Sequence, residues 1–112
     1  MKKTVTIKSN RDFQRLYRRG KSAAAGTLVI YWQKNRQGDS RLGITTGTKL
    51  GKAVVRNRVR RQIREIYRLN REQLLPGRDI IVVARVRAVS GGYHAMEKDY
   101  LRLCKKLGLL RT

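Results

Sequence analysis

Apolar side chains recur every three or four positions in three stretches of the chain, a period typical of helices that bury one side. The first stretch, residues 10–18, begins with a residue type that caps helices and ends before a glycine. The second, residues 52–70, follows a glycine-rich loop. The third, residues 93–107, places Cys104 on its apolar stripe, so we expect that thiol to be buried as a small apolar group. The pattern predicts three helices.

Four other stretches have the composition of β-strands. Residues 27–33 (TLVIYWQ) and 41–46 (RLGITT) flank the turn residues NRQGDS, which predicts an antiparallel hairpin. Residues 21–25 predict a short strand before it. Residues 79–84 (DIIVVA) form an apolar run between two glycine-containing breaks, which predicts a strand at the centre of the sheet.

Length and composition indicate one folded domain over residues 1–112. Apolar residues make up 40% of the chain, which is enough for one core, and no repeat, linker or low-complexity block divides it. No apolar run approaches the roughly 18 residues of a membrane span, and the N-terminus lacks the features of a secretory signal. We therefore expect a cytoplasmic protein without a membrane partner.

The chain is strongly basic, with 28 Lys and Arg residues against 7 Asp and Glu and a formal net charge of +21. Such a charge opposes folding through self-repulsion unless a polyanion neutralises it. Nucleic acid is the leading partner on this ground. A single cysteine and a single histidine provide no zinc site of the usual spacing.

The predicted helix 52–70 has two faces of opposite character. A solvated helix face would mix charge signs at (i, i+4). Here Arg56, Arg60 and Arg64 repeat one sign, which costs roughly 0.2–0.5 kcal/mol per pair unless phosphates bind there. Arginine also suits bidentate contacts with phosphate, so we favour an RNA-binding face over a merely solvated one. The expected apolar stripe is Val55, Val59, Ile63, Ile66 and Leu69, and the opposite arc is Arg56, Asn57, Arg60, Arg61, Arg64, Arg68 and Arg71, with Arg58 at its edge.

The segment before this helix combines glycines with lysines. Gly43, Gly47 and Gly51 are expected to surround the helix start together with Lys49 and Lys52. Unpaired amides and the helix dipole favour an anion at that end. The Walker spacing is missing, which excludes nucleotide hydrolysis and leaves an RNA backbone as the expected ligand.

Aromatic residues are predicted on the first helix and on one strand. Phe13 and Tyr17 share a face of the helix, while Tyr31 and Trp32 point to opposite sides of the sheet. An aromatic side chain on an open sheet face, beside basic residues such as Lys8, forms a platform for single-stranded bases. The alternative is that Phe13 and Tyr17 only pack the helix onto the sheet.

The acidic residues argue against catalysis by the protein itself. Metal-dependent nucleases need two or three convergent carboxylates, whereas these acids are dispersed over predicted helices, a turn and a strand start. His94 has no second histidine with which to share general acid–base work. We expect the chemistry to reside in the partner.

The segment KAVVRNRVRRQIREIYR, preceded by RLGITTGTKLG and followed by RDIIVVAR, resembles the protein subunit of bacterial ribonuclease P. The resemblance extends to NRDFQRLYRRG and CKKLGLL near the two ends, and its most specific element is the Arg-Asn-Arg triplet within AVVRNRVRRQIRE. It implies an α/β (α+β) two-layer sandwich in the order α-β-β-β-α-β-α. It also implies a left-handed β-α-β crossover, which the usual handedness rule would not predict.

The resemblance implies a ribonucleoprotein function. In that family the RNA subunit removes the 5′ leader of precursor tRNA with magnesium ions that the RNA mainly holds. The small protein binds the leader and supports the active RNA. The chain is then part of an endoribonuclease, with no catalytic residue, no tightly bound metal and no obligate protein partner of its own.

Site residues carry over where the motifs match. The residues implied to bind the catalytic RNA are Lys49, Lys52, Arg56, Asn57, Arg58, Arg60, Arg61, Arg64 and Arg68. The residues implied to bind the leader are Lys8, Phe13, Tyr17 and Tyr31. Two other classes of protein would have the same size and charge as this chain, namely a ribosome-bound structural protein and a small RNA-binding chaperone. Both would lack specificity for a precursor tRNA with its leader.

Overall fold

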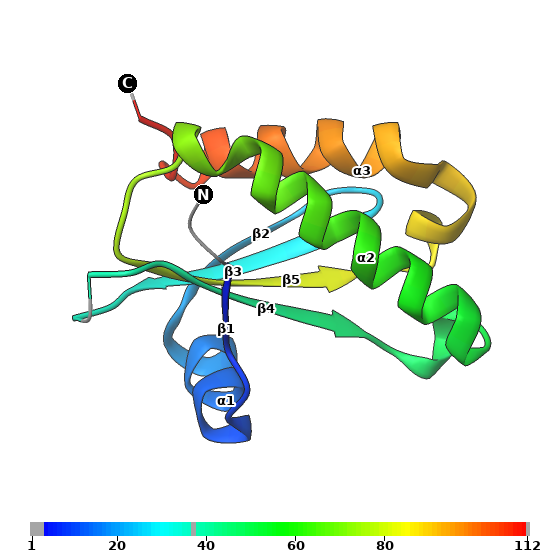
Figure 1. Ribbon diagram of the computed structural model, residues 1–112, viewed down its shortest axis with the longest axis horizontal. Helices are drawn as coiled ribbons and strands as arrows, with labels where there is room; N and C mark the ends of the chain where they lie inside the picture. The colour runs from blue at the N-terminus through cyan, green and yellow to red at the C-terminus, as the bar shows by residue number, and fades with distance from the viewer. Residues whose placement is uncertain (1–3, 37, 112) are drawn as a thin grey trace.

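The computed structural model describes residues 4–36 and 38–111, which form five strands and three helices (Figure 1). The elements follow one another as the sequence pattern predicts, with one short strand added at the start. In chain order they are β1 (Val5–Thr6), α1 (Asn10–Arg19), β2 (Lys21–Ala24), β3 (Leu28–Lys34), β4 (Arg41–Thr46), α2 (Ala53–Asn70), β5 (Arg78–Ala84) and α3 (Arg87–Lys106). Two short 3-10 turns, Thr48–Leu50 and Arg71–Gln73, flank α2.

The strands form one sheet in the order β1-β4-β5-β3-β2, with β5 at its centre. This confirms the central strand predicted from the run DIIVVA. The hairpin predicted from residues 27–33 and 41–46 is wrong, because β5 lies between β3 and β4 and pairs with both. An apolar strand buried on both faces must satisfy its backbone groups along both edges, and it therefore takes the middle of the sheet. The hairpin that forms instead joins β2 to β3.

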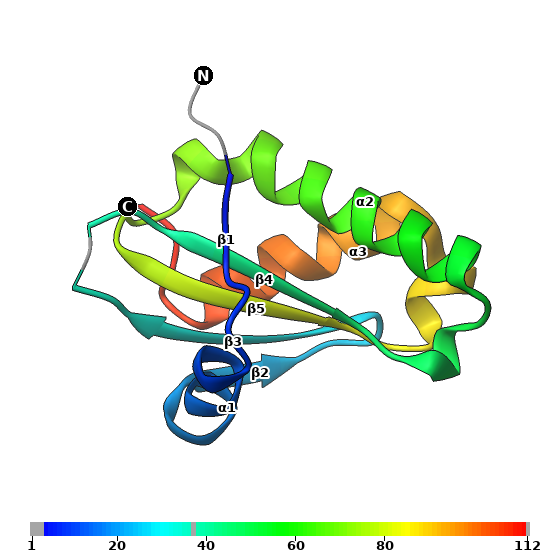
Figure 2. The ribbon, with the colours of Figure 1, turned by 60° about the horizontal axis from the view of Figure 1, so that its bottom comes forward.

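Helices α2 and α3 cover one face of the sheet, and α1 lies against the other (Figures 1 and 2). The sheet and the α2–α3 pair make up the two layers of the expected sandwich. α2 connects the parallel neighbours β4 and β5, and this crossover is left-handed, as the resemblance implies. Because α1 is short, it covers only part of its face (Figure 2).

The main core lies between the sheet and the α2–α3 layer. Cys104 is fully buried within it, which confirms the sequence prediction. Burial raises the pKa of the Cys104 thiol to about 12, so the group stays uncharged at neutral pH. A second, smaller apolar cluster joins Ile7, Leu16 and Ile81 beneath α1, on the other face of the sheet.

The last helix begins earlier than residues 93–107 predict. Helical backbone starts at Arg87, and Gly92 interrupts it with φ +78, a conformation that favours glycine. The break predicted at Gly91-Gly92 is therefore a kink inside the helical stretch. The turn before the kink has its own buried anchor in Ala88, which the period of the later residues does not reveal.

Candidate RNA-binding surfaces

The outer face of α2 is basic along its length. The helix buries Val59, Ile63 and Ile66 against the sheet, so the residues on its opposite side face solvent. Arg56 is half-buried. The other residues predicted to bind the catalytic RNA are exposed, namely Lys49, Lys52, Asn57, Arg58, Arg60, Arg61, Arg64 and Arg68. The structure thus gathers this set on one helix and the loop before it.

The apolar stripe of α2 ends differently from the prediction. Leu69 is 53% exposed, whereas Asn70 is buried. Asn70 continues the spacing of Ile63 and Ile66, while Leu69 is rotated out of that line. The amide can occupy the interior because its Nδ2 donates to the carbonyl oxygen of Ile66 at 2.8 Å.

Two arginines on α2 have partners within the protein. Arg60 Nη2 donates to Thr46 Oγ1 at 2.7 Å and ties the helix to the end of β4. Arg68 forms an exposed ion pair with Glu65, which offsets one positive charge on this face. Arg61 and Arg64 lie between these two residues along the helix and are exposed to a ligand.

The loop before α2 brings two of the three predicted glycines to the helix start. Gly51 has φ +131, a left-handed conformation that turns the chain into the helix. Within the described residues, the N-cap Lys52 supplies no capping side chain, so the first amides of α2 remain open to an anion. The placement of Gly43 at this loop is wrong, because Gly43 is buried inside β4.

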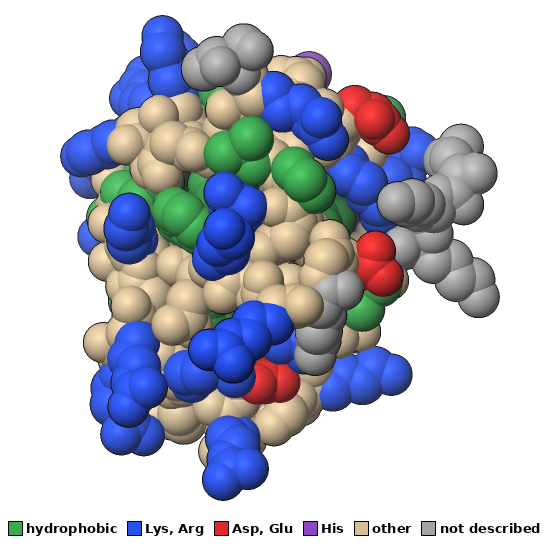
Figure 3. Space-filling view, turned by 90° about the vertical axis from the view of Figure 1, so that its left-hand side faces the viewer, with side chains coloured by type: hydrophobic (Ala, Val, Ile, Leu, Met, Phe, Trp, Pro, Cys, Tyr) green, Lys and Arg blue, Asp and Glu red, His purple; other side chains and the backbone are tan. Residues whose placement is uncertain are grey.

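Basic side chains also dominate surfaces away from α2. Lys and Arg are spread over the end of the molecule seen in Figure 3, where acidic side chains are few. The exposed residues of α3 beyond its kink are His94, Lys98, Arg102, Lys105 and Lys106. The whole molecule therefore attracts a polyanion, and α2 carries its densest arginine array.

Three of the four residues predicted to bind the leader meet on the face that α1 partly covers. The ring centroids of Tyr17 and Tyr31 lie 5.0 Å apart, edge to face, and those of Phe13 and Tyr17 lie 6.2 Å apart. All three rings are half-buried against the small cluster beneath α1. Lys8 is exposed in the connection that leads into α1.

The neighbouring aromatic residues of β3 lie on opposite sides of the sheet, as predicted. Trp32 packs against the main core, with Lys21 Nζ and the Arg78 guanidinium 5.3 and 5.4 Å from its ring centroid. Tyr31 lies on the α1 side. The Tyr17 hydroxyl is 2.7 Å from Thr45 Oγ1, a contact that restrains the position of the ring.

Phe13 packs closely on Gly43 of β4. A Cβ added to Gly43 would lie 2.8 Å from Phe13 Cζ, closer than any side chain allows. The missing side chain at Gly43 thus makes room for the ring on β4. This packing favours a mainly structural role for Phe13 and leaves Tyr17 and Tyr31 as the stronger stacking candidates.

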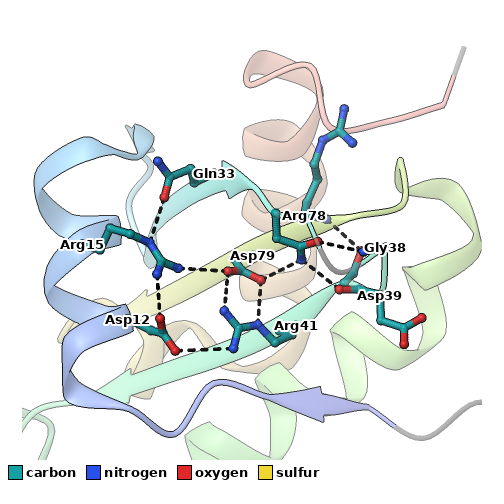
Figure 4. A network of polar contacts seen from close by, with 10 residues as sticks. Asp12, Arg15, Gln33, Gly38, Asp39, Arg41, Arg78 and Asp79 are labelled. Atoms are coloured by element: carbon teal, nitrogen blue, oxygen red, sulfur yellow. Dashed lines mark hydrogen bonds and ion pairs between the residues drawn. The ribbon is translucent and has the colours of Figure 1, made fainter.

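A polar cluster that the sequence analysis did not predict lies on the side of α1 away from the aromatic rings. We call it the Asp79 cluster, and it consists of Asp12, Arg15, Arg41 and Asp79 (Figure 4). The Asp79 side chain is only 2% exposed. Arg41 donates to both of its oxygens, with Nε at 2.9 Å and Nη2 at 2.6 Å. Arg15 joins Asp79 at 3.2 Å and Asp12 at 2.7 Å. The available signal was an acid opening an otherwise apolar strand.

Opposing effects set the pKa of Asp79. Burial raises it, but hydrogen bonds from Arg41 and Asn35 and the charges of Arg41 and Arg15 outweigh burial, so the pKa lies below its usual value. Folding therefore prefers the ionised carboxylate. This stabilisation is complete above the unfolded-state pKa of about 3.9 and is lost as the pH falls through the lower folded-state pKa.

The free energy of unfolding should accordingly decrease between about pH 5 and pH 3. Urea unfolding followed by the fluorescence of Trp32, the single tryptophan, would measure it. Asp79→Asn should be less stable at pH 6 and should lose less stability over the same range. Part of the pH dependence of stability should remain in Asp79→Asn, because hydrogen bonds from Thr27 also lower the pKa of Asp99. The exposed Asp39→Asn is the control, and an unchanged pH profile in Asp79→Asn would contradict this assignment.

The carboxylates do not fit a magnesium site. Asp12 and Asp79 are the acids brought together in the Asp79 cluster, and two guanidinium groups already occupy their oxygens. Among the described residues, no group of three or more His, Cys, Asp or Glu side chains could hold a metal ion.

No helix in the described part of the chain is long and apolar enough to cross a membrane.

Comparisons with known proteins agree on one family. The family model described as Ribonuclease P matches residues 1–108. The ribonuclease P protein component of Natranaerobius thermophilus is 40% identical over 99% of this chain and 96% of the relative, and that of Clostridioides difficile is 44% identical over 93% and 92%. Among solved structures, an RNase P protein from Staphylococcus aureus has a TM-score of 0.88 at 35% identity, covering 97% of this chain and 100% of that one. The RNase P protein from Thermotoga maritima has a TM-score of 0.81 at 32% identity, covering 90% and 96%.

Proposed function

The chain belongs to the ribonuclease P protein family, and we propose that it binds the catalytic RNA and the precursor tRNA leader while the RNA does the chemistry. Family membership implies tRNA processing and an RNA partner, which favours this function over a ribosomal protein or a general RNA chaperone. One structural observation supports the proposal that the protein binds two different RNAs. The sheet separates an arginine-rich helix from an aromatic cluster, so two RNA ligands can bind opposite faces at once.

The catalytic RNA is the proposed ligand of α2 and its preceding loop. Folded RNA presents closely spaced phosphates, and an exposed arginine array on a rigid helix can contact several of them together. Lys49, Lys52 and the open amides at the start of α2 extend this surface. Arg68 contributes less than its neighbours because Glu65 already pairs with it.

The leader is the proposed ligand of the aromatic cluster. A 5′ leader offers unstacked bases, and the half-buried rings of Tyr17 and Tyr31 are held in place while part of their surface stays accessible. Lys8 lies before α1 and would contact the backbone of the same strand. Phe13 supports the cluster from its seat on Gly43.

Magnesium belongs to the RNA in this proposal. The ions would stabilise charge at the scissile phosphate, and the described carboxylates of the protein do not converge to hold them. The protein acts by binding and orienting the substrate. It works in the cytoplasm as a complex with RNA and needs no protein partner for this role.

Purified protein alone should leave precursor tRNA uncut, because the proposed chemistry lies in the RNA. The informative assay adds a bacterial ribonuclease P RNA and compares precursors whose leaders are shortened one nucleotide at a time. Affinity of the assembled complex should rise with leader length until the leader spans the aromatic cluster, then level off. Affinity independent of the leader would contradict a leader site, and cleavage by protein freed of contaminating nuclease would contradict the division of labour.

A further inference from the structure

The Asp79 cluster occupies one row across the sheet. In the register of the strands, Asp79 on β5 lies opposite Arg41 on β4 and Gln33 on β3. Asp79 and Arg41 are joined by two hydrogen bonds, and Gln33 Oε1 accepts from Arg15 Nε at 3.1 Å. Three side chains of one row thus meet beneath the same helix.

α1 is fastened to this row by two residues one turn apart. Arg15 reaches Asp79, and Asp12 accepts hydrogen bonds from Arg15 at 2.7 Å and from Arg41 at 3.4 Å (Figure 4). The contacts close a ring of alternating charges between helix and sheet. Hydrogen bonds between charged groups are directional, so the ring restricts where α1 lies and how it is rotated.

The next row of the sheet seats the aromatic side of α1. Gly43 and Tyr31 lie on either side of Ile81, two residues along each strand and about 7 Å from the Asp79 row. Phe13, the residue after Asp12, rests on Gly43, and Tyr17 meets Tyr31. Placing Asp12 and Arg15 over the first row therefore places Phe13 and Tyr17 over the second.

The apolar packing beneath α1 is too small to define this position by itself. Its buried members are Ile7, Leu16 and Ile81, with the half-buried rings around them. Apolar contacts are non-directional and tolerate sliding and rotation of a helix. A buried charge network contributes little net stability in general, and in some proteins it fixes one arrangement of the packed elements.

We propose that the Asp79 cluster is a positioning device for leader recognition, which holds α1 so that its aromatic side chains form one wall of the leader site. Asp12, Arg15, Arg41 and Asp79 do not touch the leader in this arrangement. They act through the placement of Tyr17 beside Tyr31. This inference rests on the proposed leader site and assigns its geometry to residues outside it.

Asp12→Asn is the primary test, because Asp12 lies at the rim of the cluster and its loss leaves the Arg41–Asp79 pair in place. The readout is the leader preference, defined as the ratio of affinities of the assembled ribonucleoprotein for precursor and mature tRNA. We expect this ratio to fall about fivefold, with binding of mature tRNA unchanged. Asp79→Asn should reduce the ratio further.

Asp99→Asn is the matched control. It makes the same change of charge and removes a carboxylate that accepts from the backbone amide and hydroxyl of Thr27, at 3.0 and 2.7 Å. This carboxylate lies on α3, across the sheet from α1. Asp99→Asn should lower thermal stability and leave the leader preference unchanged. A similar loss of preference in Asp99→Asn and Asp12→Asn would overturn the positioning role, because it would reflect general destabilisation.

A double-mutant cycle with Tyr17→Ala separates positioning from a merely structural effect. If Asp12 acts by placing Tyr17, Asp12→Asn should cause little further loss of leader preference once the ring is gone. The same fivefold loss in both backgrounds would overturn the inference.

The Tyr17→Ala and Asp12→Asn variants test the leader site and the positioning role separately. If Tyr17→Ala leaves the leader preference intact, the proposed leader site is wrong and the positioning role falls with it. If Tyr17→Ala reduces the preference and Asp12→Asn does not, the leader site stands and the positioning role alone is wrong.

Discussion

Replacing Arg61 and Arg64 together with alanine should weaken binding of the protein to the catalytic RNA by at least about 100-fold, since each charged hydrogen bond contributes about 1.5–3 kcal/mol. Both side chains are exposed on the outer face of α2, away from the buried Val59 and Ile63. Thermal stability should therefore change little. Arg60 is left intact in this variant because its bond to Thr46 ties α2 to β4.

The salt dependence of RNA binding by the same variant tests the mechanism. Removing one phosphate contact should lower the slope of log affinity against log salt by about 0.7 to 0.9. Lys98→Ala with Arg102→Ala on α3 removes the same charge from another exposed helix and serves as the control. Equal losses of affinity in both double variants would mean that net charge, rather than the α2 surface, determines binding. Arg→Lys at positions 61 and 64 should restore only part of the affinity if the contacts are bidentate.

Tyr31→Ala should bring the affinities for precursor and mature tRNA closer together by about tenfold, because stacking of one base on an aromatic ring contributes about 1–3 kcal/mol. Mature tRNA lacks the leader, so its affinity should not change. Assembly with the catalytic RNA should be unchanged, since Tyr31 lies on the sheet face opposite α2. Binding of both tRNAs and of the catalytic RNA should be measured on the same preparation.

Phe13→Ala provides the contrasting case. Its ring fills the space above Gly43, so truncation should create a cavity and lower the free energy of unfolding by about 3 kcal/mol. Melting of the free variants, followed by Trp32 fluorescence, distinguishes the two roles. A large melting loss in Tyr31→Ala with equal weakening of both tRNAs would assign that ring to the core.

Local elements of this fold follow directly from the sequence, and their pairing does not. The predicted helix 52–70 agrees with α2 to within one residue because amphipathic period and chain breaks are local signals. The partners of a strand depend on distant segments. Residues 27–33 and 41–46 looked like a hairpin because they are close in sequence, and only the burial of β5 on both faces separates them. The left-handed crossover came from family resemblance and from no physical rule.

The binding surfaces show the same contrast between features encoded locally and features made by distant segments. The arginines of α2 are visible in the sequence because a helix brings residues of one face together by their spacing alone. The Asp79 cluster cannot be assembled from spacing, because Asp12, Arg41 and Asp79 come from three distant elements. In the sequence, Asp79 is only an acid at the start of an apolar strand until the strand register places Arg41 beside it. Binding of RNA by each half-buried ring depends on how much of the ring the packing of α1 on the sheet leaves uncovered, which no periodicity encodes.

Cleavage of precursor tRNA by a bacterial ribonuclease P RNA at low magnesium, with and without this protein, tests the central claim most directly. The proposed function predicts that the RNA alone is inactive under these conditions and that adding the protein produces cleavage at the 5′ end of the mature tRNA. The Arg61→Ala, Arg64→Ala protein should require a much higher concentration to do the same. Absence of cleavage at any protein concentration, with the RNA shown to be active at high magnesium, would contradict the claim.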